Sequence, residues 1–275
     1  MIWNGQVRLL ENRDIGHDHF LAVFEAREVA GALRPAQFVM LRVGDGTDPL
    51  LSRPFSVARV GLGATVDLLY KPYGRGTRIL SGLRPGTTVG MVGPLGRPFP
   101  DPPPGTTRVL AVAGGIGVAP FPLLGEHLRR LGAPRPHLLY GARQAADLVG
   151  RDLLEAAGWS IEVVTDDGSE GRRALVPALL DETLAALGPE ERARTFTYVC
   201  GPTRMMAATD AVLARHGGAG QFSVEAFMGC GFGVCLSCVI PLREGEGEDG
   251  GYRRVCVDGP TFPAGSLAWP QGLGA

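Results

Sequence analysis

The fold is indicated most clearly by the stretch Val109-Leu-Ala-Val-Ala-Gly-Gly-Ile-Gly-Val-Ala-Pro120, in which an apolar run is followed by the glycines Gly114, Gly115 and Gly117. A short apolar run that ends in glycine is typical of a buried strand, and the residues from Pro120 to Leu131 continue in a helical pattern. We therefore predict a strand over Val109–Ala113 that is connected to the following helix by a glycine turn. In dinucleotide folds this turn binds phosphate, although the spacing Gly-x-Gly-x-x-Gly is absent here. Tight packing of the strand against the helix is the alternative explanation of Gly114, Gly115 and Gly117.

The same strand-to-helix pattern recurs three times after this stretch. Strands are expected at His137–Tyr140, Ile161–Thr165 and Phe196–Val199, and helices near Ala145–Ala157, Ala174–Ala186 and Thr203–Arg215. Strands that alternate with helices predict a parallel sheet covered on both faces. The segment Cys200-Gly201-Pro202 follows the last of these strands, at the carboxyl edge where open α/β sheets bind ligands. The thiol of Cys200 itself is interpreted as a buried core group.

Upstream of the glycine turn the pattern differs. Short β segments such as Phe38–Val43, Pro54–Ala58 and Val66–Tyr70 are separated by turn signals, which favours an antiparallel barrel or sandwich. A stiff, exposed linker, Asp101-Pro-Pro-Pro-Gly105, follows this region. The predicted fold class is therefore all-β followed by α/β.

Composition excludes several function classes. The chain of 275 residues has a formal net charge of −1, which gives no electrostatic reason to expect binding to nucleic acid or to an anionic membrane. The first residues, Met1–Phe20, lack the basic and apolar regions of a signal peptide. The longest apolar run, Val109–Leu124, contains several glycines and prolines and is not expected to span a membrane. We expect a soluble, cytoplasmic protein.

Four of the five cysteines lie near the C-terminus. Cys230, Cys235 and Cys238 have the spacing Cys-x4-Cys-x2-Cys, and Cys256 follows as a remote fourth. This is the plant-type layout for a [2Fe–2S] cluster, in which one tight loop supplies three thiolates and a distant residue supplies the fourth. Structural zinc is the main alternative, but it usually shows two Cys-x2-Cys knuckles. Disulfides are disfavoured in a reducing compartment.

Two segments of the β region have features of a phosphate site. Arg53-Pro54-Phe55-Ser56 opens a strand with a planar guanidinium suited to pyrophosphate. Leu69-Tyr70-Lys71, which contains the only lysine, ends another strand. The glycine-rich turn that follows, with Gly76 and Thr77, leads into a helix start, where free N–H groups attract phosphate. Tyr70 is expected either to lie against a cofactor ring or simply to pack.

These motifs, in this order, resemble the ferredoxin–NADP reductase superfamily. The residues that carry the resemblance are Arg53-Pro54-Phe55-Ser56, Gly74-x-Gly76-Thr77, Gly93-Pro94-Leu95-Gly96, Gly114-Gly115-x-Gly117 and Cys200-Gly201-Pro202. The tail, Gly229-Cys230 to Cys238 followed by Val255-Cys256-Val257-Asp258-Gly259-Pro260, is similar to that of the electron-transfer subunits of dihydroorotate dehydrogenase B. The likeness covers nearly the whole chain.

The resemblance implies three domains. An antiparallel β-barrel over residues 1–101 would bind FAD, with Arg53 on the pyrophosphate and Ser56 near the flavin ring. Leu69 to Lys71, Gly76 and Thr77 would complete that site. A parallel-sheet domain over residues 102–222 would bind NAD at the glycine turn and at the Cys200 segment. A small domain over residues 223–275 would hold the [2Fe–2S] cluster on its four cysteines.

The resemblance also implies a partner, a separate FMN-containing subunit that oxidises dihydroorotate, in a heterotetramer with two copies of each chain. Electrons would pass from that FMN through the cluster and FAD to NAD⁺ in pyrimidine biosynthesis. This chain has no residues of its own for dihydroorotate chemistry, and no catalytic base is assigned. One departure is an acidic, glycine-rich loop over Glu244–Gly251, which would affect partner docking rather than the cluster.

Other functions remain open at this point. A diaphorase-like subunit of a soluble hydrogenase, or of a ferredoxin–NADP transhydrogenase, would share the same motifs. Asp166 and Asp167, which follow the third strand of the α/β region, favour NAD over NADP only if they reach the adenosine. A different class is a non-catalytic binding module with zinc in the tail. The segment His17-Asp18-His19 could be drawn as a metal site, but it lies in a polar stretch near a turn, so a solvated loop is the favoured interpretation.

Overall fold

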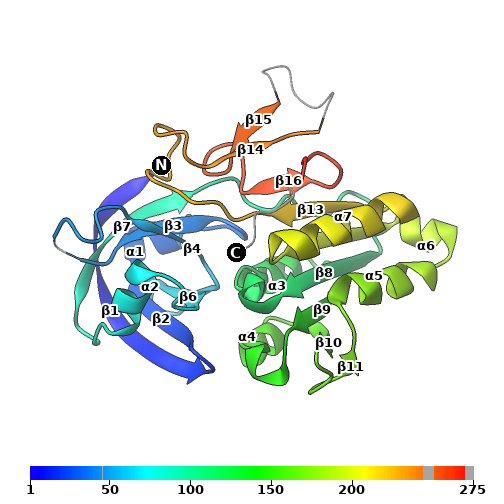
Figure 1. The fold of residues 1–275 in the computed structure, drawn as a ribbon, viewed down its shortest axis with the longest axis horizontal. Helices are drawn as coiled ribbons and strands as arrows, with labels where there is room; N and C mark the ends of the chain where they lie inside the picture. The colour runs from blue at the N-terminus through cyan, green and yellow to red at the C-terminus, as the bar shows by residue number, and fades with distance from the viewer. Residues whose placement is uncertain (45, 244–250, 270–275) are drawn as a thin grey trace.

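The computed structural model describes residues 1–44, 46–243 and 251–269. The chain forms a curved antiparallel sheet and then a parallel sheet flanked by helices (Figure 1). A cysteine-rich segment follows and lies across one end of both. The predicted loop over Glu244–Gly251 lies outside the described residues, except for Gly251. Within the described ranges, no helix combines the length and the apolar character that crossing a membrane requires.

The first sheet is a half-barrel of seven antiparallel strands in the spatial order β4-β3-β7-β1-β2-β6-β5. Its elements are β1 (Trp3–Gly16), β2 (His19–Glu25), α1 (Arg27–Ala30), β3 (Phe38–Arg42), β4 (Arg53–Ser56), β5 (Arg59–Gly61), β6 (Thr65–Tyr70), α2 (Arg75–Ser81) and β7 (Thr88–Leu95). Alternate side chains of β1 point into the core, since Val7 and Leu9 are buried while Arg8 and Leu10 are exposed. The predicted antiparallel β region is confirmed.

The second sheet has the order β11-β10-β9-β8-β12-β13-β16 and is parallel except for its last strand. Its strands are β8 (Arg108–Gly114), β9 (His137–Ala142), β10 (Ser160–Thr165), β11 (Arg172–Arg173), β12 (Thr195–Cys200), β13 (Ala219–Ser223) and β16 (Thr261–Pro263). The helical elements between them are η1 (Gly115–Val118), α3 (Phe121–Arg130), η2 (Ala145–Asp147), α4 (Arg151–Ala156), α5 (Val176–Ala185), α6 (Pro189–Ala193) and α7 (Thr203–His216).

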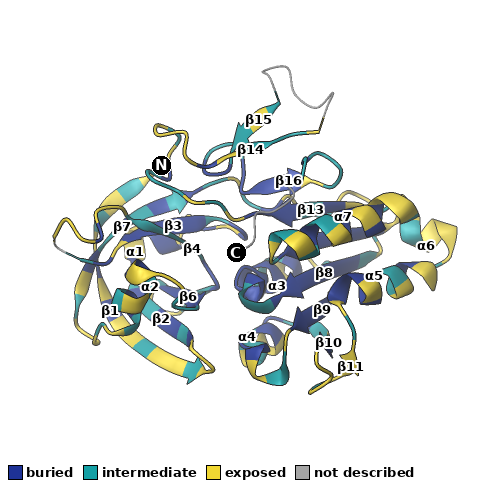
Figure 2. Cartoon of the chain, in the orientation of Figure 1, coloured by how far each residue is buried: buried dark blue, intermediate teal, exposed yellow. Residues whose placement is uncertain are grey.

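Helices cover both faces of this sheet, as the sequence predicts. Along β8, Ala111 packs with α3 and α4 on one face, and Val112 packs with α5 and α7 on the other. Because alternate residues of a strand point to opposite faces, a strand buried on both sides needs a continuous apolar run. Figure 2 shows the central strands β8 and β9 almost entirely buried, while the helices expose their outer faces.

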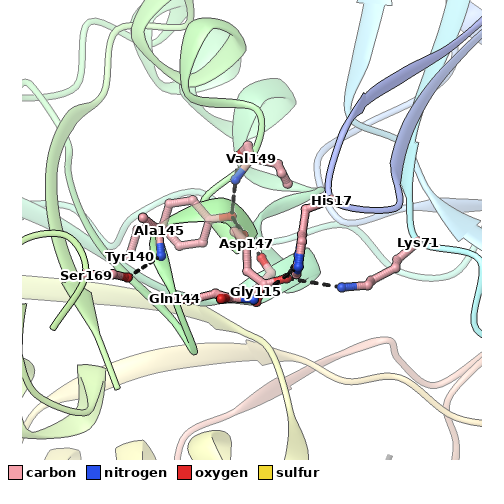
Figure 3. Close-up of polar contacts among 9 residues, drawn as sticks. All are labelled: His17, Lys71, Gly115, Tyr140, Gln144, Ala145, Asp147, Val149 and Ser169. Atoms are coloured by element: carbon pink, nitrogen blue, oxygen red, sulfur yellow. Dashed lines mark hydrogen bonds and ion pairs between the residues drawn. The ribbon is translucent and has the colours of Figure 1, made fainter. Parts of the chain in front are cut away.

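One helix prediction is wrong. The expected helix over Ala145–Ala157 is divided into the short η2 and α4, because Gly150 between them has a left-handed backbone conformation with φ of 70°. A right-handed helix cannot continue through such a residue. The break leaves Asp147 at the end of η2, where it points toward the half-barrel (Figure 3).

The cysteine-rich segment is tied to both sheets. It contains the two-stranded ribbon β14 (Val239–Pro241) and β15 (Tyr252–Arg254), after which β16 returns to pair with β13. The N–H of Arg97, just after β7, donates to the carbonyl of Gly259 at 2.6 Å. On α7, the buried carboxylate of Asp210 accepts hydrogen bonds from Arg243, Gly265 and Trp269. The boundary expected near residue 222 stays a prediction.

Candidate functional site

The structure brings Arg53 on β4 against the start of α2. An added Cβ on Gly76 would lie 3.0 Å from Cγ and 3.1 Å from Nε of Arg53. The position of the Arg53 guanidinium is stabilised by a hydrogen bond, in which its Nη1 donates to the carbonyl of Leu51 at 2.6 Å. Two motifs that are separate in the sequence therefore form one surface, and glycine is needed at position 76 to make room for the arginine side chain.

Thr77 shapes the turn before α2. Its hydroxyl oxygen accepts the N–H of Gly74 at 3.1 Å and, through its own proton, donates to the Gly74 carbonyl at 3.0 Å. Thr77 thus stabilises the turn in this structure. Pro54 and Ser56, which flank the buried Phe55 on β4, are half-buried.

Tyr70 packs inside the half-barrel. Its hydroxyl donates to Oδ1 of Asn12 at 3.0 Å, and its ring lies edge-on to Phe55, 5.8 Å away between centroids. Burial raises the pKa of Tyr70. Tyr70 therefore packs against Phe55, and the expected contact of its ring with a cofactor stays a prediction. The adjacent Leu69 points the other way, toward Gly150 of the second sheet region.

The glycine turn after β8 packs directly on the segment after β12. An added Cβ on Gly117 would lie 2.5 Å from Cα of Gly201, and one on Gly114 would lie 2.9 Å from Cδ of Pro202. Gly115 differs, because it has φ of +51° and a Cβ there would meet no atom within 4 Å. Close packing accounts for Gly114 and Gly117, so Gly115 is the glycine of this turn that is open to a ligand.

The thiol of Cys200 does not face this open space. Cys200 is 1% exposed, and burial raises the pKa of its thiol. Its carbonyl would lie 2.7 Å from a Cβ on Gly117, so the backbone of this segment supports the turn. The interpretation of Cys200 as a core thiol agrees with this burial, and the expected contact of the Cys200-Gly201-Pro202 segment with NAD stays a prediction.

The four tail cysteines have unequal environments. Cys235 is exposed, and hydrogen bonds from Ser237 and then Cys230 lower its pKa to about 6. Cys256 is buried, and burial together with the neighbouring Cys238 raises its pKa to about 12. The N–H of Val234 donates to Sγ of Cys230 at 3.3 Å. Such N–H donors stabilise thiolates that bind iron, so this donor set fits an iron–sulfur cluster.

The loop that carries Cys230 also contacts the half-barrel. An added Cβ on Gly231 would lie 2.6 Å from Cγ of Met40, and Met40 pairs with Pro54 across β3 and β4. The candidate cluster loop is therefore one strand away from the candidate flavin strand.

A polar contact that the sequence did not reveal joins the two sheet regions (Figure 3). The ammonium of Lys71, at the end of the half-barrel strand β6, lies 3.1 Å from Oδ1 of Asp147, and Nδ1 of His17 lies 2.8 Å from the same oxygen. Burial raises the pKa of Asp147, but the hydrogen bonds from His17 and Lys71 outweigh burial and hold that pKa below its usual value.

The interpretation of His17-Asp18-His19 as a solvated loop is wrong for His19. His17 and Asp18 form the tight turn between β1 and β2, with φ of 48° and 56°, which directs His19 inward. His19 is 1% exposed. Burial, and then the nearby Lys71, lowers its pKa, so the imidazole is neutral near pH 7. No local sequence pattern indicates this burial, because Lys71 and Asp147, which lie near His19 in the fold, are distant from it along the chain.

Comparison with known proteins identifies the family to which this chain belongs. Residues 225–268 match the model of the iron–sulfur cluster binding domain of dihydroorotate dehydrogenase B, and residues 111–211 match the oxidoreductase NAD-binding domain. The electron transfer subunit of dihydroorotate dehydrogenase B (NAD(+)) from Desulforamulus reducens is 37% identical over 90% of this chain and 91% of that relative. This chain belongs to that family.

Family membership makes the chain an oxidoreductase subunit, and solved structures agree on the fold. The structure of an NADH-dependent reduced ferredoxin–NADP oxidoreductase superposes with a TM-score of 0.82 at 26% identity, covering 96% of this chain and 90% of that one. A ferredoxin NADP⁺ reductase from Neisseria gonorrhoeae, solved with FAD and NADP, has a TM-score of 0.66 at 19% identity. That likeness covers 78% of this chain and 92% of the reductase, and it concerns the fold alone.

Proposed function

We propose that this chain is the electron-transfer subunit of an NAD-dependent dihydroorotate dehydrogenase B. It works with a separate FMN-containing catalytic subunit, with two copies of each chain in the complex. The names of its relatives support this assignment, as does the match of the tail to the cluster-binding model of the same enzyme. No residue is assigned as a base for dihydroorotate, whose oxidation belongs to the partner.

The contact between Gly231 and Met40 is the observation that carries the proposal. It seats the cysteine loop on β3, whose neighbour β4 begins with Arg53. The cysteine loop is therefore separated from the candidate flavin strand β4 by β3 alone, which gives a short path for electron transfer. The open Gly115 belongs to the second sheet, so a nucleotide would approach from that side.

The residues of this chain have distinct parts in that task. Cys230, Cys235, Cys238 and Cys256 would hold the cluster. Arg53 would neutralise the pyrophosphate of FAD, and the backbone at Gly115 and Gly201 would receive NAD. When bound, the cluster supplies one-electron transfer, and the flavin supplies both one-electron and two-electron chemistry.

The zinc alternative for the tail has less support from the geometry. A tetrahedral zinc ion with sulfur ligands at about 2.3 Å requires all four sulfurs to converge within roughly 4 Å of one another. In the part of the chain that the structure describes, no three of these cysteine sulfurs lie within 4.8 Å of one another. A flat two-iron cluster needs this wider spread, because each iron takes only two of the thiolates.

The diaphorase-like alternative within the superfamily is favoured by one observation. The ferredoxin–NADP oxidoreductase structure superposes over nearly the whole chain. Its identity of 26% is nevertheless lower than the 37% of the dihydroorotate dehydrogenase relative. Reduced ferredoxin with NADP⁺, and dihydroorotate with the FMN subunit and NAD⁺, are the two assays that separate these functions.

The proposal is tested by separating the activities. The purified chain should be yellow-brown, contain flavin and iron, and oxidise NADH with a small artificial acceptor. It should not oxidise dihydroorotate until the FMN subunit is added, after which NAD⁺ is reduced. Dihydroorotate oxidation by the isolated chain would contradict this division. A colourless, zinc-containing protein would contradict the redox function altogether.

The cluster assignment has its own test. Cys235→Ser should abolish or distort the [2Fe–2S] absorbance and EPR signals while FAD stays bound, because Cys235 lies outside the half-barrel. Cys200→Ser is the matched control, since that thiol is buried at the end of β12, and its cluster signals should be unchanged. Normal cluster spectra after serine substitution at each of the four tail cysteines would overturn the ligand assignment.

A further inference from the structure

Three side chains that ligate metals converge where the β1–β2 turn meets η2. They are His17 and His19 from the half-barrel and Asp147 from the second sheet region. One ligand atom from each lies within 4.8 Å of the others, and no other such group of three occurs in the described part of the chain. This place is distinct from the cysteine tail, and none of these residues belongs to the flavin or nucleotide motifs.

His19 is the least explained member of the group. It is 1% exposed, and its Nδ1 is buried with no hydrogen-bond partner in the structure. A buried imidazole nitrogen without a hydrogen-bond partner destabilises the folded state, and a metal ion bound to that nitrogen would satisfy it. The ring of His17 stacks at 6.4 Å between centroids, with an interplanar angle of 25°. Both imidazoles come from the half-barrel, and they lie next to each other opposite Asp147.

His17 has a neighbour suited to a metal-bound imidazole. Its Nε2 lies 3.1 Å from the side-chain nitrogen of Gln144, and its Nδ1 faces Asp147 (Figure 3). When a histidine ligates a metal through one nitrogen, the other usually donates its proton to a nearby acceptor. The Gln144 amide can turn and present its oxygen instead of its nitrogen, so it would serve either form of His17.

We propose that His17, His19 and Asp147 form a binding site for a divalent transition-metal ion of the zinc class, located between the half-barrel and the parallel sheet. Two imidazoles and one carboxylate are a common three-ligand set for such ions, with the remaining positions left to water. Because the ligands come from both regions, a bound ion would fix their relative position.

Lys71 sets the strength of this site. Its ammonium lies 3.1 Å from Oδ1 of Asp147, so it already supplies a positive charge that an incoming ion must displace or tolerate. Repulsion between this charge and the ion weakens binding. Replacing this lysine by an uncharged residue, Lys71→Met, should therefore strengthen metal binding at constant pH. The FAD content of this variant is measured alongside, because Lys71 is also expected in the flavin site.

The test uses the holoprotein with its iron and flavin contents measured, so that the cysteines are occupied. After dialysis against a weak chelator, Zn²⁺ binding is measured by equilibrium dialysis with metal analysis. We expect one Zn²⁺ per chain. His17→Ala and Asp147→Asn should each weaken binding by about tenfold or more, and Gln144→Ala by a similar factor. Lys71→Met should tighten it.

His137→Ala is the matched control. His137 also pairs with a carboxylate, Glu162 at 3.3 Å, but it has no third ligand in the group and should not affect Zn²⁺ binding. His19→Ala removes a buried side chain and can prevent folding. In that case the test rests on His17→Ala, because the side chain of His17 is partly exposed. Absence of stoichiometric Zn²⁺ binding, or equal binding by the wild type, His17→Ala and Asp147→Asn, would overturn the proposal.

Discussion

The turn at Gly74–Thr77 and the turn at Gly114–Gly117 have similar sequences, but their glycines are needed for different neighbours. In the first, Gly76 leaves room for the side chain of Arg53. In the second, Gly117 leaves room for the backbone of Gly201. A side chain can move aside, whereas the backbone of η1 at Gly117 and the backbone after β12 at Gly201 are fixed by the strands that they follow. The glycine-rich turn is therefore expected to serve FAD binding in the first case, whereas in the second it serves the fold, with Gly115 as the open position.

Arg53→Ala should produce the largest effect in this comparison. Loss of a charge-assisted contact to pyrophosphate weakens FAD binding by about 1.5–3 kcal/mol, which is tenfold or more in affinity. Flavin content and a titration of the stripped protein with FAD measure this loss. Arg75→Ala is the control, because Arg75 is exposed and pairs with Asp48. Equal loss in both variants would show that Arg53 has no specific contact.

Gly117→Ala tests the second turn. The added methyl group would overlap the Gly201 backbone, and overpacking of this kind costs about 1–3 kcal/mol of stability. Urea unfolding should show the loss, while FAD affinity stays at the wild-type value. Gly188→Ala, where a Cβ meets no atom within 4 Å, should leave stability nearly unchanged. A fully stable Gly117→Ala protein would mean that the two turns do not differ as described.

Gly115→Ala separates packing from ligand binding within one turn. Its added Cβ meets no neighbour, so the cost comes only from the left-handed backbone and is about 1–2 kcal/mol. We expect a higher KM for NADH in the artificial-acceptor assay, because the methyl group projects into the open space. An unchanged KM would place the nucleotide away from this turn.

Gly76→Ala should have the smallest effect on stability. Alanine favours the helix by roughly 1 kcal/mol over glycine, and this gain offsets the displacement of the flexible Arg53 side chain. FAD affinity should nevertheless fall, because the guanidinium is moved. Thermal unfolding of the apoprotein and FAD titration measure the two effects separately. A large loss of stability would show that Arg53 is as rigid as a backbone segment.

Much of the fold follows from local sequence patterns. The run Val109–Ala113 predicts β8 within a residue at each end, and the periodic residues near Thr203 predict α7 equally well. The half-barrel motif at Arg53 and the cysteine spacing also identify their regions. What local patterns could not supply are contacts between distant residues. The packing of Gly117 on Gly201, the pairing of Asp147 with His17, and the return of the tail to β13 depend on tertiary structure.

The pairing of β16 with β13 also protects the parallel sheet at its edge. An uncovered strand presents a row of free N–H and C=O groups on which another molecule can add a strand. At the opposite edge the sheet ends in β11, which is two residues long and consists of the exposed arginines Arg172 and Arg173. A short, charged strand discourages such association by itself. At the β13 edge the same protection comes from the polypeptide that carries the cysteines, so a chain cut before β16 should self-associate through β13 even where its nucleotide-binding sheet is intact.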